Sequence, residues 1–274
     1  TKNEQGDRPR VFRYERDTTY EWVPLNHLDQ IGGTLYDDDS PLLWGAPESW
    51  TWSRRHKSTE VRLHGPLTAQ FHPNWSNGTA AVRCSRPLAH NRKTYWEIRI
   101  SQRVFGTSMM FGVATRSARL HANTFVNLLG EDQHSWGLSH KGLIWHAGRW
   151  RTFTRPFPEN EATVVGMLYD GRKGTLTYYK DGICLGVAFE GLSTQDLYPV
   201  VSSTAAKTEM TLGAVRREFV NLQDRCRAVI LNRVREGSEH TLILPSLLKR
   251  YILEGRRKGC GGLESMRRAP KWVC

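Results

Sequence analysis

The feature that most constrains the fold is a run of alternating apolar and polar residues between residues 163 and 189. Lys180-Asp181-Gly182-Ile183 joins two alternating segments, and Asp-Gly readily adopts the two positive φ angles of a type I′ turn. The stretch Tyr169–Thr175 supplies a longer turn before them. We therefore predict a three-stranded antiparallel meander over residues 163–189, with local connections between neighbouring strands.

Short segments of the same kind recur from Trp50 to Leu212, with almost no helical periodicity between them. Many short strands separated by turns are typical of a mainly β fold, so we predict an antiparallel two-sheet sandwich. The predicted strands are residues 60–64, 79–84, 94–100, 108–115, 135–139, 143–146, 163–169, 174–180, 183–189, 198–203 and 209–212.

Two short amphipathic helices are predicted after the sandwich. In the first, which follows Asn221 as a suitable N-cap, the apolar residues at helical spacing are Leu222, Cys226, Val229 and Ile230. In the second, Pro245 suits a first helical position, and the apolar stripe is Leu244, Leu247, Leu248, Tyr251 and Ile252. Helices this short are marginal alone in water, so their apolar faces must be buried. The pattern leaves open whether they cover their own domain or dock another protein.

The net charge of +12 raises the question of nucleic-acid binding. Eight of these excess charges lie in residues 215–274, and this position is more typical of a basic tail than of a binding groove with interleaved aromatic residues. Nucleic-acid association is therefore kept as an alternative and is not our main hypothesis. Arg256-Arg257-Lys258 would also suit nuclear import.

The sequence offers little support for membrane insertion, disulfide formation or metal binding. No run approaches the roughly 18 to 20 apolar residues of a membrane span, and residues 1–8 show no signal-peptide pattern. The five cysteines are scattered and include no Cys-x-x-Cys pair. We expect reduced thiols, no metal, no cofactor, no membrane association, and a location in the cytoplasm, the nucleus or both.

Candidate catalytic residues are also weak. The nearest are His134 with Ser135, His140, His146 and Cys184, and none lies in a nucleophile elbow or at metal-ligand spacing. We expect a protein without catalytic activity of its own.

Several segments resemble the SPRY (B30.2-like) domain in order and spacing. They are Trp96-Glu-Ile, Phe111-Gly-Val-Ala, Ser135-Trp-Gly-Leu, Gly174-Thr-Leu-Thr-Tyr-Tyr-Lys-Asp-Gly and Leu197-Tyr-Pro-Val-Val-Ser. The C-terminal stretch resembles a SOCS box, with Leu222-x-x-x-Cys226-x-x-x-Ile230 similar to an elongin C-binding box and residues 242–251 similar to a cullin-5 box. Together these motifs resemble the family of SPRY domain-containing SOCS box proteins. Trp50-x-Trp52, Gly78–Arg83, Gly106–Met110, Thr124–Gly130 and Ser202–Ala206 further resemble one member of that family.

This resemblance implies a domain order and a set of partners. The expected parts are an irregular leader (1–48), a bent two-sheet SPRY sandwich (49–214), a small helical SOCS box (215–253) and a basic tail (254–274). The implied function is that of a substrate-recognition subunit of a ubiquitin ligase, with elongin B, elongin C, cullin-5 and its RING subunit as partners. A SPRY scaffold without a ligase role is the alternative.

The resemblance also assigns roles to residues of the C-terminal helices. Elongin C contacts fall on Leu222, Cys226, Val229 and Ile230, and the cullin box on Leu242, Leu244, Pro245, Leu248 and Tyr251. Leu247, Leu248 and Tyr251 are expected to pack partly on the box helices and partly on the sandwich. Ile243 stands where the family pattern has a proline, which weakens the cullin assignment relative to the elongin assignment.

Substrate recognition is expected at loops at one end of the sandwich. Members that bind short Asn-containing peptides use loop segments that this chain lacks: Phe125 stands at their Tyr, and Thr204-Ala205-Ala206 at their Val-Trp-Gly. We expect a short, linear, polar degron here, for which asparagine-containing peptides are one candidate class. Thr107 and Thr204 would pair with its amides, and Trp75 and Phe125 would supply apolar contact, unless these two are ordinary core or rim aromatics. The predicted face is Asn74, Trp75, Gly78, Thr107, Phe125, Thr204 and Ala205.

Overall fold

The computed structural model describes residues 45–101, 103–234 and 242–260. These residues all belong to one unit of the chain, residues 38–274. The predicted leader, apart from residues 45–48, and the last part of the predicted basic tail, residues 261–274, lie outside the described residues.

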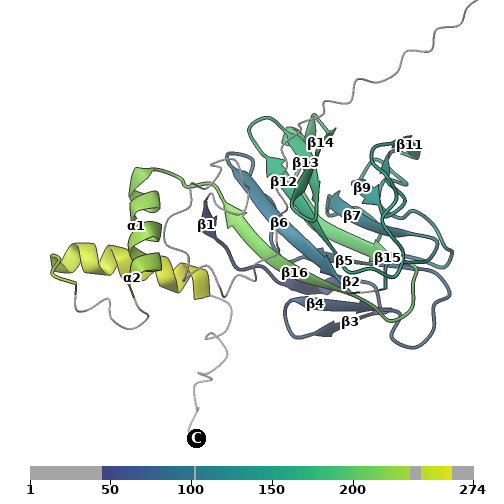
Figure 1. The fold of residues 1–274 in the computed structure, drawn as a ribbon, viewed down its shortest axis with the longest axis horizontal. Helices are drawn as coiled ribbons and strands as arrows, with labels where there is room; N and C mark the ends of the chain where they lie inside the picture. Colours follow the sequence, from purple (N-terminus) through teal and green to yellow (C-terminus); the bar gives the residue numbers. More distant parts are fainter. Residues whose placement is uncertain (1–44, 102, 235–241, 261–274) are drawn as a thin grey trace, which may run out of the picture. The chain divides into compact units, whose positions relative to one another are not determined.

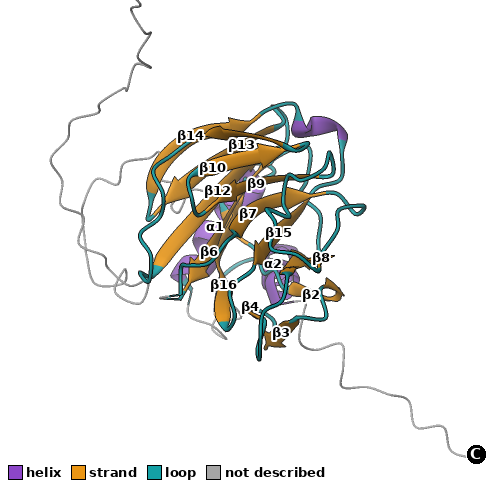
Figure 2. Ribbon diagram, turned by 90° about the vertical axis from the view of Figure 1, so that its right-hand side faces the viewer, coloured by secondary structure: helices purple, strands orange, loops and turns teal. Residues whose placement is uncertain are grey.

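Two antiparallel sheets form the fold (Figure 1). The first has the order β14 (Ile183–Phe189), β13 (Thr175–Lys180), β12 (Thr163–Asp170), β6 (Lys93–Ile100), β16 (Thr208–Arg217), β4 (Thr68–Phe71) and β3 (Val61–His64), and β1 (Ala46–Pro47) also pairs with β16. The second has the order β11 (Arg149–Thr152), β10 (Leu143–His146), β9 (Ser135–Ser139), β7 (Met109–Ala114), β15 (Tyr198–Ser203), β5 (Thr79–Cys84) and β2 (Trp52–Lys57), and β8 (His121–Ala122) pairs with β5. Figure 2 shows strands and loops making up almost all of this region, with a short 3-10 helix, η2 (Leu192–Thr194). The predicted mainly β sandwich is confirmed.

The main core lies between the two sheets and is built from alternating residues of each strand. Trp96 of β6 is fully buried and packs its ring 5.7 Å from that of Trp50. The hydroxyl of the buried Tyr178 donates to the carbonyl of Phe111 across the core, which satisfies its polar atom. A second, smaller apolar cluster includes Ala81, Met110, Ala114, Leu128, Leu129 and Val200. The second sheet is therefore covered on both faces.

The predicted turn at Asp181-Gly182 is confirmed. Their φ angles are +49° and +82°, and Lys180 pairs with Ile183 across the hairpin, as a type I′ turn requires. The carboxylate of Asp181 also accepts hydrogen bonds from the Thr163 hydroxyl and the Val164 amide, which tie the turn to β12. The predicted meander is β12, β13 and β14.

Each of the eleven predicted strands corresponds to an observed one, but five strands were not predicted. These are β1, β2, β4, β8 and β11. In β2 only Trp52 and Ser53 are buried, and all four residues of β11 are exposed, so neither shows the alternation of a half-buried strand. The others are only two to four residues long.

The two predicted C-terminal helices are present as α1 (Leu222–Arg233) and α2 (Ser246–Cys260). The side chain of Asn221 accepts a hydrogen bond of 2.9 Å from the Asp224 amide, which confirms the predicted N-cap. Helix α2 begins one residue after Pro245, whose carbonyl accepts from the Lys249 amide. It continues to Cys260, past the predicted end of the SOCS box at residue 253.

Candidate functional site

Four loops come together at one end of the sandwich, and we call them the loop end: residues 73–78, 103–108, 123–127 and 204–207. The Ser76 hydroxyl donates to the carbonyl of Thr204, which joins the first loop to the last. The Thr79 hydroxyl donates to the carbonyl of Thr124 over 2.8 Å, which brings the third loop beside the first. Loops far apart in sequence are thus held in one surface.

Thr204 links the loop end most extensively. Its hydroxyl donates to the Ser108 carbonyl over 3.0 Å and accepts from the Ser108 amide over 2.9 Å. Because the one hydroxyl hydrogen is used and Thr204 is buried, its side chain holds the second and fourth loops together. This differs from the expectation that Thr204 pairs with amides of a ligand.

The seven predicted substrate-face residues separate into two groups. Asn74, Trp75, Thr107 and Phe125 are exposed, with 81% of Trp75 accessible, so Trp75 and Phe125 are not core aromatics. Gly78, Thr204 and Ala205 are buried. A Cβ on Gly78 would lie 2.2 Å from the carbonyl oxygen of Ala122, so this position accepts no larger residue without movement. The buried group supports the surface that the exposed group forms.

The histidines considered for catalysis have structural contacts. The ring of His140 is buried and its Nδ1 accepts from the Met109 amide, and burial lowers its pKa. His146 stacks on Trp136 at 4.5 Å and contacts the Ser135 carbonyl. Among the described residues, no group of three or more His, Cys, Asp or Glu side chains is placed to hold a metal ion.

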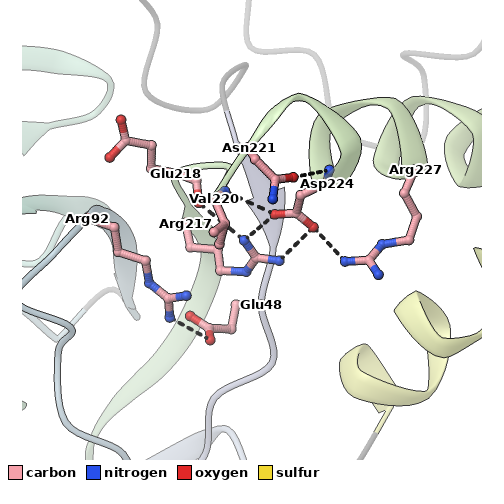
Figure 3. Close-up of polar contacts among 8 residues, drawn as sticks. All are labelled: Glu48, Arg92, Arg217, Glu218, Val220, Asn221, Asp224 and Arg227. Carbon is pink, nitrogen blue, oxygen red and sulfur yellow. Dashed lines mark hydrogen bonds and ion pairs between the residues drawn. The ribbon is translucent and has the colours of Figure 1, made fainter. Parts of the chain in front are cut away.

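Helix α1 is fixed to the sandwich through Asp224 (Figure 3). Arg217, at the end of β16, donates to both carboxylate oxygens over 2.7 and 3.2 Å, and Arg227 donates over 2.7 Å. The Val220 amide donates a further bond. These donors, of which Arg217 has the largest effect, hold the pKa of Asp224 well below its usual range. They outweigh the burial of its side chain, which is only 8% exposed and which would by itself raise the pKa. We call Arg217, Asp224 and Arg227 the Asp224 hub.

The apolar residues of α1 lie on the side of the helix that remains accessible. Leu222 is 74% exposed, Cys226 and Val229 are also exposed, and Ile230 is partly so. The helix is thus held to its own sandwich by a buried carboxylate and keeps its apolar stripe free. Sequence reasoning found the stripe and missed Asp224, although the Asp224–Arg227 spacing of three residues was a signal.

The residues assigned to the cullin box are more open than expected. The Arg227 guanidinium lies 4.6 Å from the ring centre of Tyr251, so Tyr251 does pack on the neighbouring helix. Leu247 is 72% exposed and so packs less than expected, whereas Leu248 is 49% exposed, which agrees with the partial packing that was expected. Pro245 is exposed, and Leu242 and Leu244 are partly exposed. Ile252 of α2 is buried.

Comparison with known proteins supports the same organisation. The SPRY domain family model matches residues 93–215. SPRY domain-containing SOCS box protein 1 from Homo sapiens is 31% identical over 259 residues, which cover 87% of this chain and 94% of that protein. The chain belongs to the family of SPRY domain-containing SOCS box proteins.

Two further relatives refine this placement. SPRY domain-containing SOCS box protein 3 from Xenopus tropicalis is 40% identical over 199 residues, which cover 72% of this chain and 54% of that protein. The higher identity supports the predicted likeness to this one member. The chain spans about half the length of the SOCS box protein 3 relatives that it matches. Protein gustavus from Drosophila melanogaster is 30% identical and is covered over 80% of its length.

In residues 45–101, 103–234 and 242–260, neither helix has the length and apolar content that crossing a bilayer requires.

Proposed function

We propose that this protein is the substrate-recognition subunit of an elongin B/C–cullin-5 RING ubiquitin ligase. The observation that carries the proposal is the orientation of α1, in which Asp224 binds the sandwich while Leu222, Cys226 and Val229 lie exposed. A short helix with a free apolar stripe is suited to lie in the groove of a partner, and the family is named for its SOCS box. Elongin C is the partner that the motif implies.

The size of this stripe suits a stable contact. Full burial of a Leu or Val side chain contributes about 1.5–3 kcal/mol, so Leu222 and Val229 together can anchor a helix in a groove. Cys226 lies between them in sequence, and its small side chain would allow close approach of the partner. Ile230, which is partly exposed, would complete the contact.

The cullin-5 contact is proposed for Leu242, Leu244, Pro245, Leu248 and Tyr251. Its support is the exposed start of α2, where Pro245 and Leu248 are accessible. Tyr251 also contacts Arg227, so this surface adjoins α1. Ile243, at the position of the missing proline, is fully exposed and therefore free to take part.

The substrate contact is proposed for the loop end. Asn74, Trp75, Thr107 and Phe125 offer polar and aromatic groups to a bound segment, and Gly78, Thr204 and Ala205 support them from below. The four loops carry the cations Arg103 and Lys207 and no Asp or Glu, so a neutral or acidic polar segment is favoured over a basic one. The degron proposed here is therefore short, linear and polar.

In this role the protein needs no catalytic residue of its own. By holding a degron and a ligase together it raises the effective concentration of a substrate lysine near a ubiquitin-charged enzyme. The chemistry would be supplied elsewhere in the complex.

The decisive experiment is co-purification of elongins B and C with the full chain. We expect Leu222→Ala combined with Cys226→Phe to abolish capture of both, while Gln223→Ala, an exposed polar change on the same helix, preserves it. Circular dichroism would verify that the double variant is folded. Retention of both elongins by the double variant would reject the proposed face and favour a SPRY scaffold without a ligase role.

A further inference from the structure

Three arginines, together with a histidine and a tyrosine, form a group on the second sheet, outside the loop end. We call it the basic cluster: Arg55, His56, Arg83, Arg116 and Tyr198, from strands β2, β5 and β15 and the loop after β7. The guanidinium groups of Arg83 and Arg116 lie 4.9 and 5.6 Å from the ring centre of Tyr198, and Arg116 also donates to its hydroxyl over 2.7 Å. Two arginines therefore share one tyrosine.

Arg83 is unusual because it is a buried cation without an acidic partner. Its residue is 3% exposed, its Nη1 donates to the Thr115 carbonyl, and its buried Nε has no hydrogen-bond partner among the described residues. Buried guanidinium groups are normally paired with a carboxylate because desolvation of an isolated charge is costly. Burial and the neighbouring Arg116 both lower the pKa of Arg83, and Tyr198 only partly offsets them.

The surroundings of Arg83 add positive charge. Strand β2 pairs with β5 on both sides of Arg83, with Trp52 opposite Cys84 and Lys57 opposite Val82, so the residues between them, Arg55 and His56 included, lie next to this part of β5. Desolvation, followed by the charges of Arg83, Arg116 and Arg55, lowers the pKa of the exposed His56. The carboxylate of Asp196 raises the pKa of Arg116, but it has the smallest effect of the groups that shift this pKa. Asp196 also lies 3.3 Å from His90. The cluster thus has a net positive charge that the described residues leave largely uncompensated.

The cluster is separate from the proposed degron site. Arg83 pairs with Val200 near the start of β15, whereas Ala80 pairs with Ser203 at the end that leads to Thr204. The two surfaces therefore lie at opposite ends of the same pair of strands. Binding at the basic cluster would not depend on the proposed ligase role.

We propose that the basic cluster is a second binding site, which takes an acidic segment of a partner protein. The cations come from three separate elements, so they suit several carboxylates spaced along a chain better than one compact anion. The aromatic ring of the cluster, Tyr198, is only 5% exposed, so nucleic-acid bases would find no platform on which to stack. Arg116 and Arg55, which are exposed, would make the direct contacts, and Arg83 would supply unscreened charge beneath them.

Fluorescence anisotropy of labelled probes against the full chain would test this site. The probes are an eight-residue Asp/Glu peptide, its Asn/Gln counterpart, the same neutral peptide with one phosphoserine, and a single-stranded oligonucleotide. The test variant is Arg55→Gln with Arg116→Gln, which changes only exposed side chains. The matched control is Arg149→Gln, an exposed arginine on β11 at the opposite edge of the same sheet.

We expect the acidic peptide to bind, the neutral peptide not to bind, and the double variant to lose about tenfold in affinity while the control keeps it. Affinity should also fall as salt is raised. Arg83→Met keeps much of the apolar stem of the buried side chain. Added to the double variant, it should remove the acidic-peptide binding that remains. Equal binding by the double variant, or binding of the neutral peptide, would overturn the proposal. Preference for the oligonucleotide or for the single phosphoserine over the acidic peptide would also overturn it.

Discussion

The carboxylate of Asp224 accepts hydrogen bonds from both terminal nitrogens of Arg217, so the first turn of α1 is hydrogen-bonded to the last residue of β16. Only residues 218–221 separate the two elements. Arg227 donates to the same carboxylate and also stacks on Tyr251 of α2. One buried anion therefore links the sandwich to α1 (Figure 3), and Arg227 extends the connection to α2.

Replacement of Asp224 by Ala should destabilise the protein strongly. Two guanidinium groups would lose their shared anion, and removal of one partner from a buried ion pair costs about 3–5 kcal/mol. Chemical denaturation would measure the loss. Arg225→Ala, at an exposed position of the same turn, should change the free energy of unfolding by less than about 0.5 kcal/mol. Equal losses in the two variants would contradict the role given to the hub.

The contribution of Asp224 should depend on pH in a defined direction. Since its pKa is depressed in the folded protein, its stabilisation is fully present above the unfolded value of about 3.9 and is lost as the pH falls toward the folded value. The difference in unfolding free energy between wild type and Asp224→Asn should therefore be large at pH 7, and should shrink below about pH 4. Denaturation series at several pH values would show it, and a constant difference would argue against an ionised Asp224.

Thr204→Val should weaken the loop end without changing its shape. Valine leaves the amide of the fully buried Ser108 without the bond that the Thr204 hydroxyl accepts, at a cost of about 1–3 kcal/mol. The Ser108 carbonyl keeps its bond from the Thr204 amide. Thr107→Val, an exposed change in the adjoining loop, serves as the control and should be nearly neutral. Thermal unfolding of both variants would measure the loss of stability. Equal melting temperatures would show that the Thr204 hydroxyl does not hold the two loops together.

Trp75→Ala with Phe125→Ala should abolish substrate capture while elongin binding persists. Both side chains are exposed, so the change removes apolar contact area with little effect on folding. Pulldown with the proteasome inhibited would compare this variant with Trp150→Ala, an exposed aromatic on β11. Undiminished capture of the same proteins by the double variant would exclude the loop end as the substrate face.

Ile243→Pro should strengthen cullin-5 association and leave elongin association unchanged. The position is fully exposed, so no packing is lost, and proline would restrict Leu242 to an extended conformation before the binding segment. Quantitative co-purification of cullin-5 with the wild type and with the Ile243→Pro variant would measure the effect. No gain in cullin-5 would show that residue 243 does not control this contact.

The sequence predicted the strands marked by apolar runs, by alternation or by a turn, and the strands that it missed are short or mostly exposed. Residues 183–189 were found through their turn, whereas Arg149–Thr152 forms a strand with every side chain exposed and leaves no periodic signal. The Asp224 hub and Arg83 were missed for another reason. Their importance depends on a buried charge meeting, or lacking, a partner from a distant strand or loop, and local sequence patterns do not contain that information. The exposed aromatics of the loop end were predicted because they could be aligned with a known family.

In helix α1 a carboxylate faces the fold, while Leu222 and Val229 lie exposed. A molecule without its partner therefore exposes the apolar stripe of α1, which cellular quality control would recognise. The steady-state amount of this protein should then follow the supply of whatever covers the stripe, and surplus copies should be short-lived. Its abundance would be set stoichiometrically, by the partner, without a dedicated regulator.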